Sequence, residues 1–445
     1  MASEAKARQL GLPMTIALIV GNMIGAGIFL LPAQLAPLGP NAVYGWLLTI
    51  GGVMCLATVL MILSARISGG PFAYVEQTLG ALPAFLIMWV YLIGCWAGLP
   101  AIAIAGVSYL SHVEPAIGRP GIAPTIALVA IWATVAINSR GARSGGAVQL
   151  VTSVLKVLPL VAAAVVAAAS FGSGSHSAIQ TSQPLSGGSL AAAATLALFS
   201  MLGFECATMP ADKIRNAKRT VPIATITGPL ITGAIYVAAY ASVLFLLSGP
   251  RTAASPAPFA DAIAPLLGPA AATVVALFAA ISALGCVNGW VLIAGEVPLT
   301  LARDGVFPMW FAKTSRLGTP VRAQLVAGAV STLLILANYS KSMAGLFAFS
   351  ALVTTVTSLF LYAAVSAAAL ALVATGRVRS WVLAAAAVPG LIFALWAFWG
   401  AGEEPSLWGV ALLATGIPIY FLMRRGERSS LLAEAAQAAP PEPAA

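Results

Sequence analysis

The sequence predicts an all-α integral membrane protein with twelve membrane-spanning helices. Of its 445 residues 60% are hydrophobic and only 8% are charged, too few charges to cover a soluble protein of this size. Its apolar runs reach the roughly 20 residues that a helix needs to cross a bilayer, and the alternating polarity of an outer-membrane barrel is absent. The spans are expected at 12–36, 43–67, 82–110, 122–138, 147–171, 190–211, 222–248, 268–298, 321–338, 343–374, 381–400 and 405–423.

The basic residues predict the orientation of these spans. An even number of spans places both termini on one side of the membrane. Of the 22 lysines and arginines, 18 lie in the N-terminus and in alternate loops, and three lie in the opposite loops: Arg119, Arg251 and Lys341. Because positive loops face the cytoplasm, both termini are expected to be cytoplasmic, in an inner (plasma) membrane. This topology explains the net charge of +9 and argues against nucleic-acid binding.

The spans divide the chain into four parts. They are a cytoplasmic N-terminus (1–10), a transmembrane core (11–375) with two inverted repeats (about 11–171 and 190–374), two further helices (381–423) and a disordered cytoplasmic tail (424–445). The first apolar segment is too long for a cleavable signal peptide and lacks its cleavage site.

Neither cysteine nor histidine predicts a metal site. The four cysteines lie within spans, without CxxC spacing, and are interpreted as packing residues: Cys55, Cys95, Cys206 and Cys286. His112 and His176 are expected in outer loops, away from any intramembrane centre. No metal and no cofactor is therefore expected.

Glycines interrupt the first and sixth spans at midspan. Gly25 and Gly27 lie in the first and Gly203 in the sixth, five spans apart, as two inverted repeats with broken first helices predict. A break frees amides that suit a carboxylate and carbonyls that suit an ammonium, which together describe a site for an α-amino acid. The alternative is close helix packing through small residues, since GNMIG has a small-xxx-small spacing.

Two ionisable residues are expected at membrane depth, where such groups are usually functional. Glu205 lies midway along the sixth span and Lys156 within the fifth. A structural hydrogen bond is the alternative for Glu205, and a side chain that extends to the interface is the alternative for Lys156. Glu296 lies near a span end, where a position at headgroup level explains it.

Several segments resemble the amino acid–polyamine–organocation superfamily, and within it bacterial arginine/agmatine-type antiporters. They are GNMIGAGIFLLPA (21–33), SGGPFAYVEQTLG (68–80), GFECATMPADKIRNAKRTVPIATI (203–226), NGWVLIAGE (288–296), RDGVFP (303–308) and GTPV (318–321). The similarity extends over roughly residues 10–425. It implies a leucine-transporter-like fold of twelve helices with a 5+5 inverted repeat, transport by alternating access and, commonly, a homodimer.

The resemblance also implies roles for individual residues. The substrate carboxylate would bind the backbone of Ala26 and Gly27. The substrate ammonium would bind the carbonyls of Met23, Phe199 and Leu202. Phe199 would close over the substrate, Trp290 would line its side-chain pocket, Glu205 would be an acidic gate and Phe360 an aromatic gating residue. Tyr91 and Trp96 match family aromatics, with packing as an equal alternative.

Three departures from the antiporter pattern concern the substrate. Leu99 replaces an asparagine and Leu352 a serine, both of which hold the guanidinium, and Ala26 replaces another serine. Without these partners, each unpaired donor of a buried guanidinium costs about 1–3 kcal/mol of binding free energy. The sequence therefore predicts a transporter of neutral or hydrophobic amino acids. The ring of Trp290 could still bind a cationic side chain through a cation–π interaction, so an arginine/agmatine-type antiporter is the alternative.

Lys156 is a further departure, because the arginine/agmatine antiporters have a small residue there. Proton-coupled relatives have lysine at this position, and burial disfavours the charged form of lysine, so proton coupling through Lys156 is expected, with Glu205 as second candidate. The alternative is a permanent tether to the first span. A membrane enzyme and a channel are disfavoured by the scarcity of polar residues in the spans, whereas a non-transporting amino acid sensor on the same fold stays open. The expected partners are an amino acid or amine, protons and the bilayer.

Overall fold

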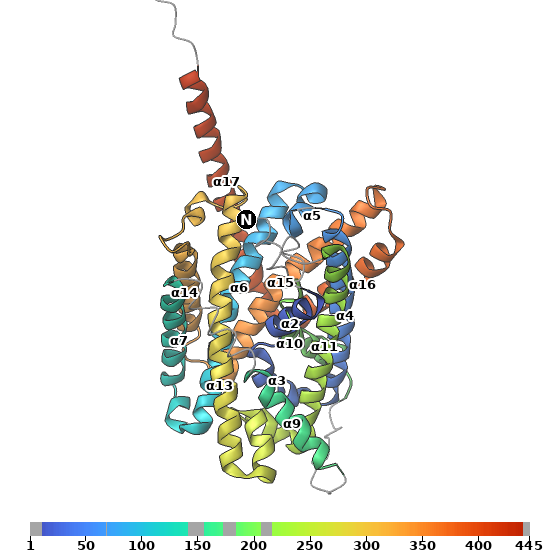
Figure 1. Cartoon of the computed structure of the whole chain (residues 1–445), viewed down its shortest axis with the longest axis vertical. Coiled ribbons are helices and arrows are strands. Elements are labelled where there is room, and N and C mark those ends of the chain that lie inside the picture. The colour runs from blue at the N-terminus through green and yellow to red at the C-terminus, as the bar shows by residue number, and fades with distance from the viewer. Residues whose placement is uncertain (1–10, 68, 141–154, 172–183, 206–215, 439–445) are drawn as a thin grey trace, which may run out of the picture.

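A computed structural model describes residues 11–67, 69–140, 155–171, 184–205 and 216–438, and these residues contain helices but no strand (Figure 1). The helices are α2 (Leu12–Met23), α3 (Gly27–Leu35), η1 (Ala36–Leu38), α4 (Pro40–Ser64), α5 (Gly70–Leu79), α6 (Ala81–Val113), η2 (Pro115–Gly118), α7 (Ile122–Ser139), α9 (Val157–Ala169), α10 (Gly187–Met201), α11 (Ala217–Leu246), α12 (Gly249–Ala254), α13 (Pro258–Arg303), η5 (Met309–Ala312), α14 (Val321–Ala337), α15 (Met343–Ala374), α16 (Trp381–Gly400) and α17 (Glu403–Ala438).

The described helices confirm an all-helical membrane protein. Eight of them are long and apolar enough to cross a membrane, and α2, α3, α9, α10 and α14 are shorter apolar helices. Each predicted span overlaps at least one of these helices. The predicted span portions 147–154 and 206–211 lie outside the described residues, and the count of twelve crossings and the inverted repeat stay predictions.

The first span is broken, as its glycines predict. Helix α2 ends at Met23 and α3 begins at Gly27. Between them Ile24 leaves the helical conformation with φ −68° and ψ 85°, and the Gly25 amide donates to the Met23 carbonyl at 2.7 Å, in a tight turn. Gly25 fits because a Cβ there would lie 3.3 Å from the Cys286 sulfur.

The sixth span also leaves the helical conformation where predicted. Helix α10 ends at Met201, and Leu202 is extended with ψ 149°. Gly203 has φ 102°, a conformation that side chains rarely adopt and that glycine tolerates. The described residues stop at Glu205, so the second half of this span lies outside them.

Helix α6 lies at the centre of the bundle and packs against α13 and α15 (Figure 1). Its apolar window is 89% buried, far more than that of a helix facing lipid on one side. A Cβ on Gly94 would lie 2.0 Å from the Thr357 hydroxyl oxygen, so the glycine allows α6 and α15 to approach closely. These two helices form the fixed wall against which the broken helices lie.

Helix α13 has two parts separated by Gly268, whose φ is 82° and ψ 170°. The part after Gly268 contains the predicted span 268–298, and the part before it is a short additional helix. In Figure 1 this short part lies at the end of the bundle opposite α5.

The end of the chain differs from its prediction. Residues 425–438 continue α17 as helix, where the sequence predicted a disordered tail from 424 onward. The reason is local, because alanine, leucine and glutamate in this segment are strong helix formers. Figure 1 shows this extension leaving the bundle at the end that also holds α5. Residues 439–445 lie outside the description.

Candidate functional site

The start of α3 presents two amides that the protein leaves open. The amides of Ala26 and Gly27 donate to no acceptor within the described part of the chain, and both residues are buried. They lie at the amino end of α3, where the helix dipole favours negative charge. The sequence predicted this carboxylate site, and the geometry provides the donors for it.

The carbonyls freed on the other side of the break already have partners. In an unbroken helix the Gly21 and Met23 carbonyls would accept from residues 25 and 27. Instead the Lys156 ammonium donates to the Gly21 carbonyl at 3.3 Å, and the Tyr236 hydroxyl donates to the Met23 carbonyl at 2.7 Å. Two of the freed carbonyls, those of Gly21 and Met23, are therefore satisfied, whereas the amides of Ala26 and Gly27 are open.

This arrangement differs from the expected ammonium site. Met23 was expected to accept from the substrate, but its carbonyl already accepts from Tyr236 and from the Gly25 amide. The Phe199 carbonyl accepts only a long bond, 3.4 Å from the Leu202 amide, and retains capacity for a further donor. Among the expected carbonyls, those at the end of α10 are therefore better placed than that of Met23.

A small cavity of about 20 Å³ lies at the open amides. Its lining comes from the broken first span, from the end of α10 and from the facing helices α6, α13 and α15: Met23, Gly25, Ala26, Gly27, Gly98, Ile102, Phe199, Ser200, Leu202, Trp290 and Thr354. Six of the predicted substrate residues are thus brought together: Met23, Ala26, Gly27, Phe199, Leu202 and Trp290.

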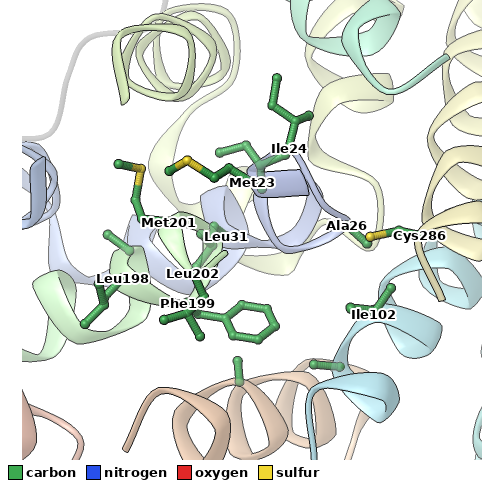
Figure 2. Close-up of a cluster of buried hydrophobic side chains, with 14 of the residues drawn as sticks. Met23, Ile24, Ala26, Leu31, Ile102, Leu198, Phe199, Met201, Leu202 and Cys286 are labelled. Atoms are coloured by element: carbon green, nitrogen blue, oxygen red, sulfur yellow. The ribbon is translucent and has the colours of Figure 1, made fainter. Parts of the chain in front are cut away.

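Phe199 lies directly over the start of α3. A Cβ on Gly27 would be 3.0 Å from two carbons of the Phe199 ring, and this ring packs edge-on against Phe347 with 5.9 Å between centroids. Figure 2 shows the ring pointing from α10 toward the side where Ile102 of α6 lies, with Ala26 next to Cys286. Phe199 therefore has the position expected of an aromatic residue that covers the site.

Two predicted pocket residues do not line the cavity. Leu99 is fully buried in α6, but its neighbours Gly98 and Ile102 supply the lining from this helix. Leu352 of α15 is also absent from the lining, which Thr354 supplies instead. Successive helical residues differ in direction by about 100°, so an alignment that is off by one or two positions selects another face.

Two residues of the lining, Thr354 and Ser200, have hydroxyl groups that already donate within their own helices. Thr354 donates to the Ser350 carbonyl at 2.8 Å, and Ser200 donates to the Ala197 carbonyl at 2.9 Å. Because each hydroxyl proton is used within its own helix, the oxygen offers only lone pairs. Acceptors of this kind suit an ammonium or guanidinium, and the sequence analysis did not identify either residue.

Glu205 is buried and held between three elements. Its carboxyl group accepts from the hydroxyls of Tyr91 on α6 at 2.8 Å and Tyr362 on α15 at 2.9 Å, and from the Gly203 amide at 3.0 Å. Tyr91 lies seven residues before Gly98 on α6, roughly 10 Å along the helix toward the end that holds α5. Glu205 therefore connects α10 to the fixed wall on that side of the cavity.

Phe360 lies away from the cavity. Its ring packs against Phe398 of α16 with 5.3 Å between centroids, and its edge is 3.4 Å from the position of a Cβ on Gly409 of α17. The α15 aromatic that contacts Glu205 is Tyr362, two residues further along the helix. Phe360 and Tyr362 lie two residues apart on α15, and the sequence alone did not show which of these two aromatic residues lies near Glu205.

Replacing Gly27 with alanine is expected to weaken substrate binding about tenfold, because the new methyl group displaces the Phe199 ring at a typical overpacking cost of roughly 1–3 kcal/mol. The apparent KM of a labelled substrate in proteoliposomes measures this. Gly21→Ala is the matched control, because a Cβ at Gly21 has no atom within 4 Å. An unchanged KM in the Gly27 variant would show that Phe199 does not cover the bound substrate.

Comparison with known proteins identifies the family. The family model described as amino acid permease matches residues 10–423. The cadaverine/lysine antiporter of Escherichia coli K12 is 32% identical over 77% of this chain and 78% of that protein. A putative arginine/ornithine antiporter of Bacillus subtilis 168 is 30% identical over 75% and 78%, and the putrescine transporter PotE of E. coli K12 is 26% identical over 95% and 97%. The chain belongs to the amino acid permease family and is a membrane transporter.

Proposed function

We propose that this protein exchanges a basic amino acid for an aliphatic amine across the inner membrane by alternating access. Its relatives are named for lysine, cadaverine, arginine, ornithine and putrescine. This favours the antiporter alternative over the neutral amino acids that the sequence analysis preferred. That preference depended on Leu99, Leu352 and Ala26; Ala26 lines the cavity, whereas Leu99 and Leu352 do not.

The proposal rests on one observation: the same cavity has open amides, which can bind an anion, and hydroxyl oxygens, which can bind a cation. The amides of Ala26 and Gly27 suit the carboxylate of an amino acid. The oxygens of Thr354 and Ser200 and the face of Trp290 suit a cationic side chain. A diamine lacks the carboxylate and leaves both amides unpaired, so it should bind more weakly than the amino acid with the same alkyl chain.

In the transport cycle that we propose, Phe199 closes one side of the site, and Glu205 with its tyrosine partners closes the other. The substrate enters from the outside, Phe199 covers it, and separation of Glu205 from its tyrosine partners then opens the opposite side. Lys156 stabilises the broken first span and is the candidate proton carrier, with Glu205 as the second. The twelve-helix inverted repeat, the cytoplasmic termini and a homodimer belong to the same proposal, and the orientation is supported by the distribution of basic residues.

The lining also gives a specific reason to retain neutral amino acids as a second candidate. Met23, Ile102 and Leu202 are apolar, and Trp290 accommodates an aromatic or aliphatic side chain as well as a cation. A competition panel separates the two functions. We expect uptake of labelled lysine to be inhibited by unlabelled lysine, arginine, ornithine, cadaverine and putrescine, and not by leucine, phenylalanine or methionine. The reverse pattern would support a neutral substrate.

Exchange is tested in liposomes that contain the purified protein. Uptake of labelled lysine is expected only when lysine or cadaverine is loaded inside. Accumulation driven by a pH gradient without internal substrate would instead indicate proton symport. Failure to move any amino acid or amine would reject the transporter proposal and favour a sensor.

The variant that tests the cation site is Thr354→Val, which keeps the shape and removes the acceptor. We expect inhibition by lysine and cadaverine to weaken about tenfold or more, because a buried donor without a partner costs roughly 1–3 kcal/mol. Thr355→Val is the control, since Thr355 is equally buried and donates to the Ala351 carbonyl but lies outside the lining. Equal effects in both variants would remove Thr354 from substrate recognition.

A further inference from the structure

A second cavity lies at the end of the bundle where α5 turns into α6 and α17 leaves the apolar region. It has a volume of about 140 Å³ and is lined by Phe72, Glu76, Ala81, Phe85, Gly305, Val306, Tyr420, Met423 and Arg424. In the sequence the apolar run of α17 ends at Met423 and is followed by Arg424, Arg425 and Arg428, which places this cavity at the membrane boundary. It is separate from the substrate cavity, with which it shares no lining residue.

The floor of this boundary cavity is aromatic. Phe85 packs against Tyr420 with 5.3 Å between ring centroids and against Phe307 at 5.5 Å. Next to the cavity, Phe421 and Leu422 are 53% and 65% exposed on the surface of α17. An apolar floor that continues into a lipid-facing helix surface suits an acyl chain and the glycerol region of a lipid.

The rim of the boundary cavity has one charge of each sign. The Arg424 guanidinium lies over the Tyr420 ring, 5.0 Å from its centroid, which positions it while leaving its N–H groups available. Glu76 is exposed on α5, one helical turn after Phe72. Neither charge forms an ion pair within the described residues. A ligand with an anionic and a cationic group would satisfy both.

We infer that this boundary cavity binds a zwitterionic phospholipid with a primary ammonium, that is, phosphatidylethanolamine. The phosphate pairs with Arg424 and the ammonium donates to the Glu76 carboxylate. Phosphatidylglycerol places the same phosphate at Arg424, but its neutral glycerol headgroup offers Glu76 a hydroxyl donor without a positive charge. The quaternary ammonium of phosphatidylcholine has no N–H to donate. The site therefore distinguishes three headgroups on identical acyl chains.

Bound lipid would join elements that are far apart in the sequence. Glu76 belongs to α5, whereas Arg424 lies at the end of the apolar part of α17. A headgroup between them fixes α5 against the last span at the level of the membrane surface. The inference does not depend on which substrate is carried, because the two cavities are distinct.

Native mass spectrometry of the full chain, delipidated in detergent and supplied with the three phospholipids in turn, tests the inference. We expect phosphatidylethanolamine to be retained about two- to fivefold more than phosphatidylcholine or phosphatidylglycerol, the range for partly exposed charge pairs. Glu76→Gln should abolish the preference over phosphatidylcholine. Arg424→Gln should reduce retention of all three lipids.

Two exposed residues elsewhere provide matched controls. Arg316→Gln and Glu403→Gln remove the same charges outside the boundary cavity and should leave the retention pattern unchanged. Thermal unfolding in detergent without lipid checks that every variant folds like the parent. Equal retention of the three lipids by the parent, or a full preference in Glu76→Gln, would overturn the inference and indicate nonspecific lipid around the protein.

Discussion

Replacing Lys156 with methionine is expected to reduce exchange by at least about tenfold, through the loss of one buried hydrogen bond to the break in the first span. Lys156 is 1% exposed, and its ammonium donates to the Gly21 carbonyl at 3.3 Å. Methionine fills similar space but leaves this carbonyl unpaired, at a cost of roughly 1–3 kcal/mol. Initial rates of lysine exchange in proteoliposomes measure the effect at matched protein content.

The same position separates a tether from a proton carrier. Lys156→Arg keeps a positive charge that is not released at physiological pH. If Lys156 is only a tether, the arginine variant should keep exchange with the parent's pH dependence. If it carries a proton, the arginine variant should lose the response to a pH gradient. Parental rates in Lys156→Met would contradict both roles.

Replacing Gly52 with alanine is expected to destabilise the protein by about 1–3 kcal/mol, the usual cost of overpacking. Gly52 lies on α4 against α16, and a Cβ there would be 2.3 Å from the ring of Phe393. Phe393 is itself 7% exposed and packed in the core, so its ring cannot move aside freely. Loss of folded protein with temperature, followed by size-exclusion chromatography in detergent, measures the shift.

The adjacent glycine supplies the control for this prediction. A Cβ at Gly51 has no atom within 4 Å, so Gly51→Ala should be neutral or stabilising, because alanine favours helix. Adding Phe393→Leu to Gly52→Ala should restore part of the lost stability, since leucine vacates the region of the ring. If both alanine variants unfold alike, the close approach of α4 and α16 does not determine stability.

Local sequence was sufficient to predict the parts of the site that depend on the backbone. Glycines at midspan predicted the break that frees the amides of Ala26 and Gly27, and a carboxyl group in an apolar span marked Glu205. The structure contains this break and buries Glu205, because leaving a helix, or burying a charge, has a large cost that only particular residues and partners offset.

The features of the site that the sequence did not predict depend on contacts between distant segments of the chain. Whether Leu99 or Gly98 faces the cavity is a question of helix rotation, which packing against α15 decides. The hydroxyl of Tyr236 on α11 donates to the Met23 carbonyl, and nothing in the sequence near either residue indicates this hydrogen bond. Acceptor-only hydroxyls such as that of Thr354 depend on rotamers, which sequence does not reveal.

The two bonds that hold the end of α2 also connect it to the two helices beside it. Lys156 belongs to the segment of α9, and Tyr236 to α11, which packs along α2. A hinge motion of α2 alone breaks both bonds, whereas a joint motion of α2, α9 and α11 preserves them. The joint motion keeps two buried hydrogen bonds that the hinge motion loses, and we therefore expect α2, α9 and α11 to move together when the first span rearranges.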